Sequence, residues 1–368
     1  MKIKPVLDAL EAASHRVELV HTGQHHDTAM SGVFFDDLGL RPPDVHLGTG
    51  SGSVAAQAAR VLEAFDRYLV EAEPDVVVVV GDVTSSLACA FAAAQRAVLV
   101  AHVEAGLRSH DWSMPEEVNR VIIDRISTLL FAPSADAVEN LADEGRNDQS
   151  VHLVGNVMID SLLANLDRAL ARTPPHQILA DGDFVLATLH RPSNVDDPDV
   201  LEGIMSALRS VSDSIPVVLP VHPRLSARLE PDPAQRLDND VILIEPLGYL
   251  DFIAAQQRAR IIVTDSGGVQ EESTALGTPC LTVRESTERP ITVTEGTNRV
   301  VGVNSFDIEA AVHQTIARPP APRCPELWDG HAGQRIAAVL TAELESAHRA
   351  GGVDRRVPTR SLPRHDTG

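Results

Sequence analysis

The sequence predicts an α/β protein made of two doubly wound, Rossmann-like domains, and two observations lead to this fold class. Apolar runs of strand length alternate with amphipathic runs of helix length along most of the chain, which is typical of parallel sheets. The alternation stops once, at the weakly patterned, proline-containing residues 171–183, and then restarts. Because 368 residues suffice for two complete cores, we expect one domain on each side of this stretch and a ligand site in the cleft between them.

The first domain is expected over residues 1–170. It opens with a predicted helix at residues 3–13, and periodic apolar residues predict further helices at residues 54–72 and 84–95. Its strands are predicted at residues 17–21, 76–80, 97–103, 129–132 and 151–154.

The second domain is expected over residues 184–348, after a linker at residues 171–183. Its strands are predicted at residues 184–188, 217–221, 241–244, 261–264 and 280–283, and its last amphipathic helix at residues 336–348. Residues 349–368 are rich in arginine, proline and glycine without periodicity, and we expect them to be disordered.

The most informative stretch lies at residues 261–290, where an apolar strand runs into a glycine-rich turn and then a helix. The turn consists of Asp265, Ser266, Gly267 and Gly268. Its two glycines let a ligand approach the backbone, and the first helical turn offers unpaired N–H groups at the positive end of the helix dipole. Such a turn is also a plain strand-to-helix connection, but Glu272 suits ribose hydroxyls and Arg289 suits phosphate oxygens. Together these residues favour a nucleotide diphosphate at the carboxyl edge of the sheet.

Charge and composition exclude several classes of partner. A net charge of -21 and a pI near 5.0 argue against nucleic acid or an anionic membrane, because phosphates would be repelled. The longest apolar runs are strand-sized, and the N-terminus does not read as a signal peptide. Cys89, Cys280 and Cys324 lack metal-type spacing and indicate reduced thiols. We therefore expect a cytoplasmic protein with no nucleic-acid partner, no membrane partner and no metal.

A second glycine-rich segment, Gly50-x-Gly52-x-x-Ala55, formally fits a dinucleotide fingerprint. The strand before it is very short, follows Pro42-Pro43, and is not the first strand of its unit, as a nicotinamide site requires. We favour a loop that caps the helix beginning after Ser53.

Titratable residues gather where predicted strands end or where the next helix begins. They are Asp82, Glu104, the Glu116-Glu117 pair and His190. Each has a structural alternative as a helix cap, a dipole partner or one member of an ion pair. A catalytic role is favoured over a purely structural one because the carboxylates and the histidine are expected in the same cleft as the diphosphate site.

At these residues the chain resembles the non-hydrolysing UDP-N-acetylglucosamine 2-epimerases, which have the two-domain glycosyltransferase-B architecture. The similarity runs from Lys2 to about Val301. Its markers are Thr22-Gly23-Gln24-His25, Gly81-Asp82, His102-Val103-Glu104-Ala105-Gly106-Leu107-Arg108, Pro115-Glu116-Glu117-x-Asn119-Arg120, Gly155-Asn156-x-x-Ile159-Asp160, His190-Arg191, Pro220-Val221-His222, Thr264-Asp265-Ser266-Gly267-Gly268-x-Gln270-Glu271-Glu272 and Thr287-Glu288-Arg289-Pro290.

The resemblance implies a reaction and the residues that perform it. It implies acid–base roles for Asp82, Glu104, Glu116 and His190. It implies UDP contacts from Lys2, Phe252, Ser266, Gly267, Gly268, Glu272 and Arg289. The family's route expels UDP across C1 and C2 to give a bound 2-acetamidoglucal, then adds UDP back with the proton delivered to the opposite face. We therefore expect a UDP-sugar as the ligand, no cofactor, and a homodimer.

Part of this family has a second, activating UDP-N-acetylglucosamine site, and Gln24, His25, Arg191 and His222 are compatible with it. Two positions depart from the family pattern. Pro192-Ser193 replaces the usual Arg-Glu after His190-Arg191, and Leu247 replaces a glutamine common in the uridine pocket. The family's first strand and its Gly-Thr-Arg-Pro-Glu phosphate loop are not matched. We therefore expect the sequence as given to be truncated, and its strand at residues 17–21 to lack a pairing partner.

Three functions stay open at this point. The first is a 2-epimerase that interconverts UDP-N-acetylglucosamine and UDP-N-acetylmannosamine. The second is a related enzyme of the same architecture, namely a hydrolysing epimerase, an epimerase for a modified UDP-sugar, or a glycosyltransferase. The third is a nucleotide-binding remnant without catalysis.

Overall fold

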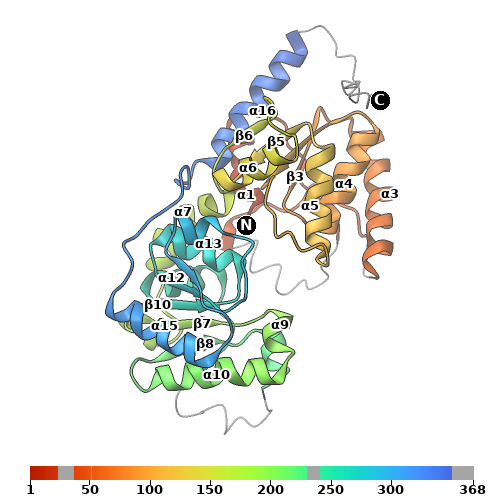
Figure 1. Cartoon of the computed structure of the whole chain (residues 1–368). Coiled ribbons are helices and arrows are strands. Elements are labelled where there is room, and N and C mark those ends of the chain that lie inside the picture. Colours follow the sequence, from red (N-terminus) through yellow and green to blue (C-terminus); the bar gives the residue numbers. More distant parts are fainter. Residues whose placement is uncertain (24–36, 51, 230–240, 350–368) are drawn as a thin grey trace, which may run out of the picture.

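The first sheet is built on strand β3 (Val76–Val80), in which every residue is a valine. In the computed structural model, which describes residues 1–23, 37–50, 52–229 and 241–349, three parallel strands follow it in order (Figure 1). They are β4 (Leu99–Val103), β5 (Leu129–Ala132) and β6 (Val151–Leu153). β1 (Val20–His21) and β2 (Val45–His46) form a separate two-stranded parallel sheet. Within those described ranges, no strand pairs with the second edge of β1 or of β3.

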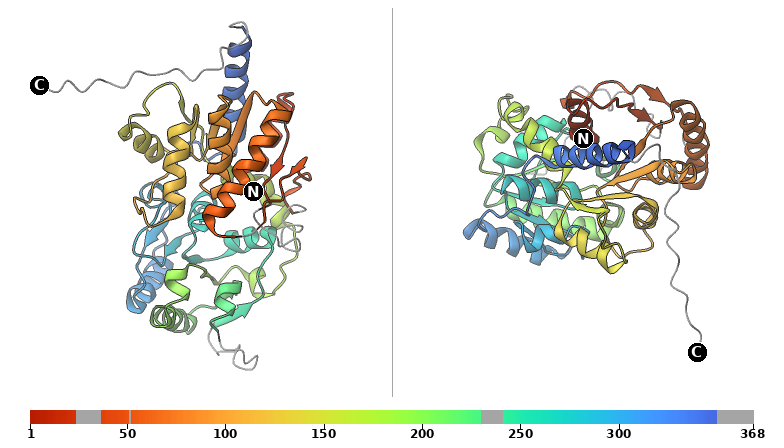
Figure 2. Two further views of the ribbon diagram at one scale, coloured as in Figure 1. Left: turned by 90° about the vertical axis from the view of Figure 1, so that its right-hand side faces the viewer. Right: turned by 90° about the horizontal axis from the view of Figure 1, so that it is seen from above.

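Helices cover both faces of this sheet, as the alternation of side chains along a strand requires. Val77 and Val79 pack with residues of α3 and α4, whereas Val76, Val78 and Val80 pack with residues of α1 and α16. The helices of this half are α1 (Ile3–Ala12), α3 (Val54–Ala72), α4 (Thr84–Gln95), α5 (Pro115–Ile126) and α6 (Ala135–Asp143), joined by α16 (Ala332–Arg349). The predicted limits of α3 and α4 are confirmed. Figure 2 shows the layers from two further directions.

The second sheet is doubly wound, with six parallel strands in the order β12-β11-β10-β7-β8-β9. They are β7 (Val185–Thr188), β8 (Val217–Pro220), β9 (Val241–Ile244), β10 (Ile261–Thr264), β11 (Cys280–Thr282) and β12 (Asn298–Val300). The chain runs outward from β7 to β9 and then returns to β10 on the other side of β7. The boundary between β7 and β10 is therefore the topological switch point, where open α/β sheets bind ligands. Two Rossmann-like domains, as predicted, make up the fold.

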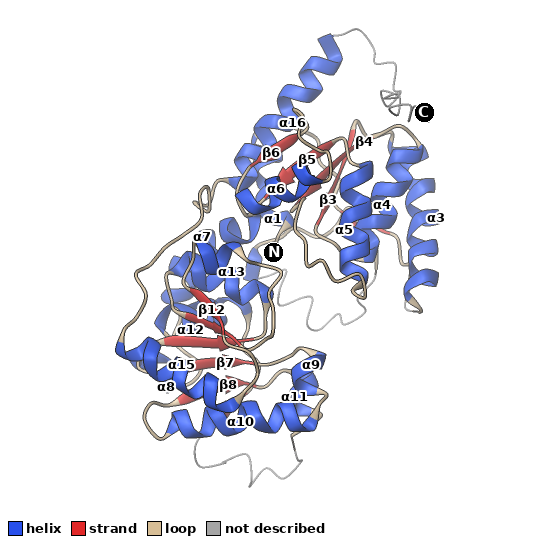
Figure 3. Cartoon of the chain, in the orientation of Figure 1, coloured by secondary structure: helices blue, strands red, loops and turns tan. Residues whose placement is uncertain are grey.

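One helix, α7 (Val157–Leu170), contacts both halves, and another, α16, returns from the second half to the first (Figure 3). The remaining helices are α8 (Ile178–Asp181), α9 (Pro192–Val195), α10 (Pro198–Ser212), α11 (Pro223–Ser226), α12 (Tyr249–Arg258), α13 (Gly267–Leu276), α14 (Ile291–Thr294) and α15 (Ser305–Ala317). α7 packs against α12 and α13 of the second half, and α16 returns to pack on α1. Across the described ranges, none of the helices combines the length and apolarity that crossing a membrane requires.

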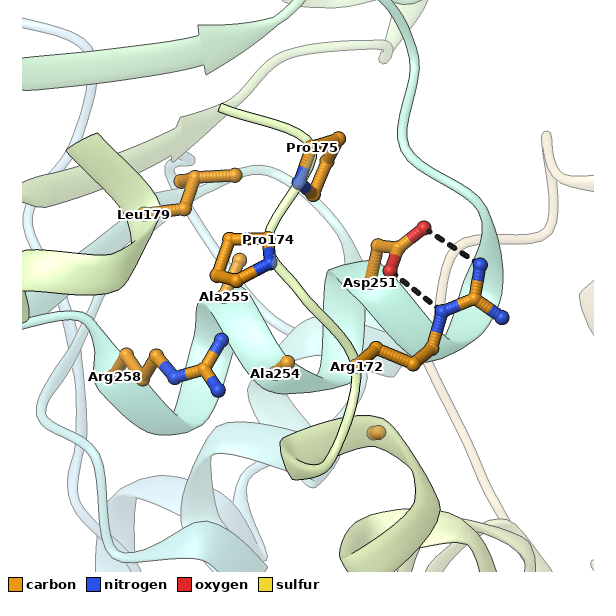
Figure 4. A pocket seen from close by; sticks show the side chains of 9 residues that line it. Arg172, Pro174, Pro175, Leu179, Asp251, Ala254, Ala255 and Arg258 are labelled. Carbon is orange, nitrogen blue, oxygen red and sulfur yellow. Dashed lines mark hydrogen bonds and ion pairs between the residues drawn. The ribbon is translucent and has the colours of Figure 1, made fainter. Parts of the chain in front are cut away.

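The segment at residues 171–183 crosses to the second sheet along α12. Arg172 Nε donates to Asp251 Oδ1 at 2.9 Å, and Arg172 Nη2 donates to Oδ2 at 3.4 Å (Figure 4). Leu179 of α8 is 1% exposed and belongs to the core of the second half. The hollow between Pro174 and α12 has no room for a water molecule, which favours packed structure over a ligand site.

The loop before α3 caps that helix, as predicted from its sequence. Ser53 occupies the N-cap position, and its Oγ accepts a hydrogen bond from Ala56 N at 3.4 Å. Ser51 and the predicted tail from residue 350 onward lie outside the described residues.

The packing of α16 on the first sheet generates a stability prediction. Ile336 is fully buried in the core that this sheet shares with α1, so Ile336→Ala should lower the free energy of unfolding by about 2–5 kcal/mol. Urea denaturation would measure this change, with Glu343→Ala on the exposed face of α16 as the control. Equal effects of the two substitutions would contradict the packing described.

Candidate active site

The turn after β10 presents a helix N-terminus at the switch point of the second sheet. α13 begins at Gly267, with Ser266 at the N-cap position. Ser266 makes no side-chain cap hydrogen bond, which leaves its hydroxyl and the first amides of the helix for a ligand. A Cβ atom at Gly267 would lie 3.0 Å from Glu288 Oε1, so the close packing at this turn favours glycine.

Asp265, at the end of β10, accepts hydrogen bonds from the loop after β7. Its buried carboxylate accepts hydrogen bonds from the backbone N–H of His190 at 3.0 and 3.1 Å and of Arg191 at 3.0 Å. His190 Nδ1 lies 2.8 Å from Asp265 Oδ1. Burial alone would raise the pKa of Asp265, but the hydrogen bond and charge of His190 lower it. His190 is thereby held at the switch point, with its side chain 39% exposed and able to reach a ligand.

Arginines surround Glu288 beside Gly267. Arg284 Nη1 donates to Glu288 Oε2 at 2.6 Å, and Arg191 Nη2 donates to Oε1. Burial alone would raise the pKa of Glu288. The positive charges of Arg191, Arg289 and Arg284 outweigh burial and lower this pKa to about 2. An ionised carboxylate therefore lies beside the N-terminus of α13, where the helix dipole favours an anion.

Glu272 and Phe252 come from two helices that pack together, α13 and α12. Glu272 Oε2 accepts a hydrogen bond from Gln256 Nε2 at 2.7 Å. Burial, with a smaller contribution from Glu271, raises the pKa of Glu272 to about 7, although the Gln256 hydrogen bond acts against it. Phe252 and Leu247 are both partly buried and pack against the core of the second half. A carboxyl group and an aromatic ring in this arrangement suit the hydroxyls and the base of a nucleoside.

Glu104, directly after β4, has a rare backbone conformation and a partly satisfied carboxylate. Its φ of 70° is one that residues other than glycine seldom adopt, and such strain clusters at functional sites. Lys2 Nζ donates to Glu104 Oε2 at 2.6 Å, whereas the buried Oε1 has no hydrogen-bond partner in the part of the chain that the structure describes. A buried carboxylate oxygen without a partner is unfavourable, which indicates a place for a ligand group.

Asp82 follows β3, and its side chain is 25% exposed. Arg120 donates to Asp82 Oδ2 through both Nη2 and Nε, the latter at 3.2 Å. Burial alone would raise the pKa of Asp82, but Arg120, followed by Lys2 and Arg289, lowers it. Glu116, by contrast, is exposed in the first turn of α5, where the helix dipole favours a carboxylate.

Buried charges from both halves meet between the two sheets. Arg289 Nε lies 2.8 Å from Glu271 Oε1, and Asn156 Nδ2 at the start of α7 donates to the same oxygen at 3.1 Å. Burial alone would lower the pKa of Arg289. The negative charges of nearby carboxylates outweigh burial and raise this pKa, and in order of effect they are Glu271, Glu104, Glu288 and Asp82. Arg289 of the second half is thus within electrostatic range of both strand-end carboxylates of the first half, so the structure brings these predicted site residues together.

The four residues proposed for a second site fall into two groups. Gln24 and His25 lie outside the described residues. His222 lies near His190, with 5.6 Å between the ring centroids, and Arg191 is paired with Glu288. Burial, followed by the charges of His190 and Arg224, lowers the pKa of His222. Arg191 and His222 therefore lie at the same edge of the second sheet as His190.

Several charged residues of this site were not predicted as site residues. They are Arg120, Asp265, Glu271, Arg284 and Glu288. Asp265 directly follows a predicted strand, which is the signal that identified Asp82. Arg120 lies one helical turn after Glu117, a spacing that predicts their ion pair but not the contact of Arg120 with Asp82.

Two Rossmann-like domains that meet at a charged junction, with a helix N-terminus at the switch point of the second, define the glycosyltransferase-B architecture. Within this class, the chain belongs to the UDP-N-acetylglucosamine 2-epimerase family, which matches residues 8–341.

Relatives of this chain cover nearly its full length. The UDP-N-acetylglucosamine 2-epimerase of Methanocaldococcus jannaschii is 39% identical over 350 residues, which are 93% of this chain and 95% of the relative. The UDP-2,3-diacetamido-2,3-dideoxy-D-glucuronate 2-epimerase of Pseudomonas aeruginosa is 40% identical over 325 residues, 88% of this chain and 90% of the relative. The crystal structure of the M. jannaschii enzyme in complex with UDP-GlcNAc and UDP has a TM-score of 0.82 at 37% identity, covering 93% of this chain and 96% of that one. The chain is therefore an enzyme of an epimerase family.

The raised pKa of Glu272 predicts a pH-dependent stability. Between its ordinary value of 4.5 and about 7, the folded state binds a proton that the unfolded state has lost, so this carboxyl should lower stability progressively as pH rises through that window. The free energy of unfolding of the native protein should fall by about 1.4 kcal/mol per pH unit relative to that of Glu272→Gln. Over the whole window this relative loss should approach about 3 kcal/mol. Urea unfolding from pH 4.5 to 8 would measure it, with exposed Glu326→Gln as the control. Parallel stability curves for the native protein and Glu272→Gln would contradict the prediction.

Proposed function

We propose that this enzyme interconverts UDP-N-acetylglucosamine and UDP-N-acetylmannosamine by eliminating UDP and adding it back. The observation that carries the proposal is that Asp82 and Glu104 of the first half lie within electrostatic range of Arg289 of the second. Proton-transfer groups from one half and a phosphate-binding cation from the other are what a reversible elimination of UDP requires. The M. jannaschii relative, crystallised with UDP-GlcNAc and UDP, supports the choice of ligand.

The residue types suit an elimination at C2. No carbonyl is conjugated with C2 of the sugar, so its hydrogen is weakly acidic and direct deprotonation is too slow. Expelling UDP across C1 and C2 avoids a free carbanion and leaves a bound 2-acetamidoglucal. Epimerisation then requires a base on one face of the ring for the elimination and an acid on the other face for the re-addition, and in this proposal Asp82, Glu104 and Glu116 supply them.

Departing UDP gains negative charge on its terminal phosphate. Arg289, the amides at the start of α13 and a protonated His190 are suited to stabilise that charge. In the same proposal Lys2, Ser266, Gly267 and Gly268 contact the diphosphate, while Glu272 contacts the ribose and Phe252 the base. Closure of the two halves would then keep water from the glycal.

One relative favours a second substrate. The P. aeruginosa protein named for UDP-2,3-diacetamido-2,3-dideoxy-D-glucuronate is as similar to this chain as the M. jannaschii enzyme is. The modified sugar is therefore the second candidate, with the same reaction at C2. Proton NMR of separate incubations would decide: the proposal predicts conversion of UDP-N-acetylglucosamine with its N-acetyl group intact, and exclusive conversion of the diacetamido sugar would overturn the first choice.

The proposed acid–base residues generate a prediction about turnover. Asp82→Asn, Glu104→Gln, Glu116→Gln and His190→Ala should each reduce kcat by about 10²–10⁴-fold, because each removes a proton-transfer or charge-stabilising group. Steady-state kinetics would measure the loss, and melting temperatures would show that folding persists. Glu139→Gln on the exposed face of α6 serves as the control. Turnover within about threefold of the native rate for all four variants would show that the assignment is wrong.

Arg289 should contribute to UDP affinity. Arg289→Ala should weaken UDP binding by about 1.5–3 kcal/mol, the range for a hydrogen bond to a charged group. Arg289→Lys, which keeps a positive charge opposite Glu271, should lose less. Calorimetry would give both affinities, with exposed Arg299→Ala as the control. Unchanged UDP affinity in Arg289→Ala would place the diphosphate elsewhere.

A further inference from the structure

A buried carboxylate organises the loop that leads into α5. Glu117 Oε2 accepts hydrogen bonds from Ser109 N at 2.9 Å and Ser109 Oγ at 2.8 Å, and Oε1 accepts one from His110 N at 2.9 Å. His110 has a φ of 57°, a left-handed conformation that its side chain disfavours. The Glu117 bonds therefore hold a strained loop, and that loop ends at Pro115 and Glu116, the first residues of α5.

The same carboxylate orients a buried guanidinium. Arg120 Nη1 donates to Glu117 Oε2 at 2.8 Å, and the other side of the guanidinium, Nε and Nη2, donates to Asp82 Oδ2. The side chains of Arg120 and Glu117 are 4% and 2% exposed. A planar guanidinium between two carboxylates has little freedom to turn, so Glu117 sets the direction from which Arg120 meets Asp82.

Asp82 is held at its backbone as well. Asn119 Nδ2 donates to the Asp82 carbonyl oxygen at 2.8 Å, so α5 contacts both ends of this residue. Both Arg120 contacts use Oδ2, and no described residue hydrogen-bonds Oδ1. The carboxylate is thus fixed through one oxygen while the other remains for a ligand.

We propose that Arg120 and Glu117 are positioning residues for proton transfer by Asp82, with Arg120 fixing the carboxylate and Glu117 fixing both Arg120 and the loop before Glu116. This inference rests on the proposed function, because it assigns Asp82 to the reaction. Neither residue need touch the sugar. Their effect should appear in kcat and in its pH dependence, and UDP binding by the second half should be largely unchanged.

The pH dependence has a definite sign. The charged groups that act on Asp82 are Arg120 of α5, Lys2 before α1 and Arg289 of the second half. Removing Arg120 takes away the largest of the positive contributions that oppose burial, so the pKa of Asp82 should rise. If Asp82 acts as a base in its ionised form, the acidic limb of the kcat profile should move to higher pH by about one unit or more.

The test compares Arg120→Ala, Arg120→Lys and Glu117→Gln with Arg125→Ala, an exposed arginine on the same helix. We expect Arg120→Ala to lower kcat by about 100-fold or more with UDP affinity within about twofold of native. Added guanidinium ion should restore part of this activity, and Arg120→Lys should be intermediate. Glu117→Gln, which keeps the shape of the side chain but loses the charge that holds Arg120, should lower kcat by about tenfold with UDP affinity again within about twofold of native.

Different outcomes separate this inference from the proposed function. If native enzyme neither binds UDP nor converts UDP-N-acetylglucosamine, the proposed function fails and the positioning role fails with it. If native enzyme is active but Arg120→Ala and Glu117→Gln match Arg125→Ala in kcat and pH profile, the positioning role alone is overturned. Should Arg120→Ala fail to fold, the kcat and UDP affinity of folded Glu117→Gln decide by the same comparison.

Discussion

The buried ion pair between Arg289 and Glu271 is the interaction on which both the site and the junction of the two halves depend. Moving either charge out of water costs several kcal/mol, so each is tolerated only while it is paired. Asn156 adds a hydrogen bond to Glu271, which ties the loop after β11 to the start of α7. The neighbouring Lys2–Glu104 pair obeys the same rule. In the proposed function Arg289 also interacts with the phosphates of UDP, so UDP binding should change the pairing of Arg289 with Glu271.

Two helices, α7 and α16, connect these buried ion pairs to the packing of the rest of the molecule. α7 lies between the halves, and its Asp160 accepts hydrogen bonds from Ala332 N at 3.1 Å and Gly333 N at 2.7 Å, at the start of α16. α16 in turn packs on α1, directly after Lys2. The position of Lys2 at Glu104 therefore depends on packing from the far end of the chain, so the geometry of the candidate site depends on both halves.

Much of the fold and of the candidate site could be predicted from local sequence patterns. Contacts between segments far apart in the sequence could not be predicted. Asp82, Glu104 and the Ser266 turn follow apolar runs, so the strand ends and the carboxyl edges of the two sheets could be inferred. The amphipathic pattern of α16 showed an apolar face but not which sheet it covers. β12 escaped prediction because its first residues, Asn298 and Arg299, are polar, and pairing with β11 defines it. Arg120 reaches Asp82 across 38 residues, a contact that no local pattern encodes.

The central claim is that the carboxylates of the first half and the cations of the second act together in a reversible elimination of UDP. Incubating the enzyme with UDP-N-acetylglucosamine in D2O and following C2 of the sugar by NMR tests it most directly. The account predicts deuterium at C2 in both the recovered substrate and its epimer, with transient release of UDP. Retention of the original hydrogen at C2 while UDP is released or the sugar is transferred would contradict it.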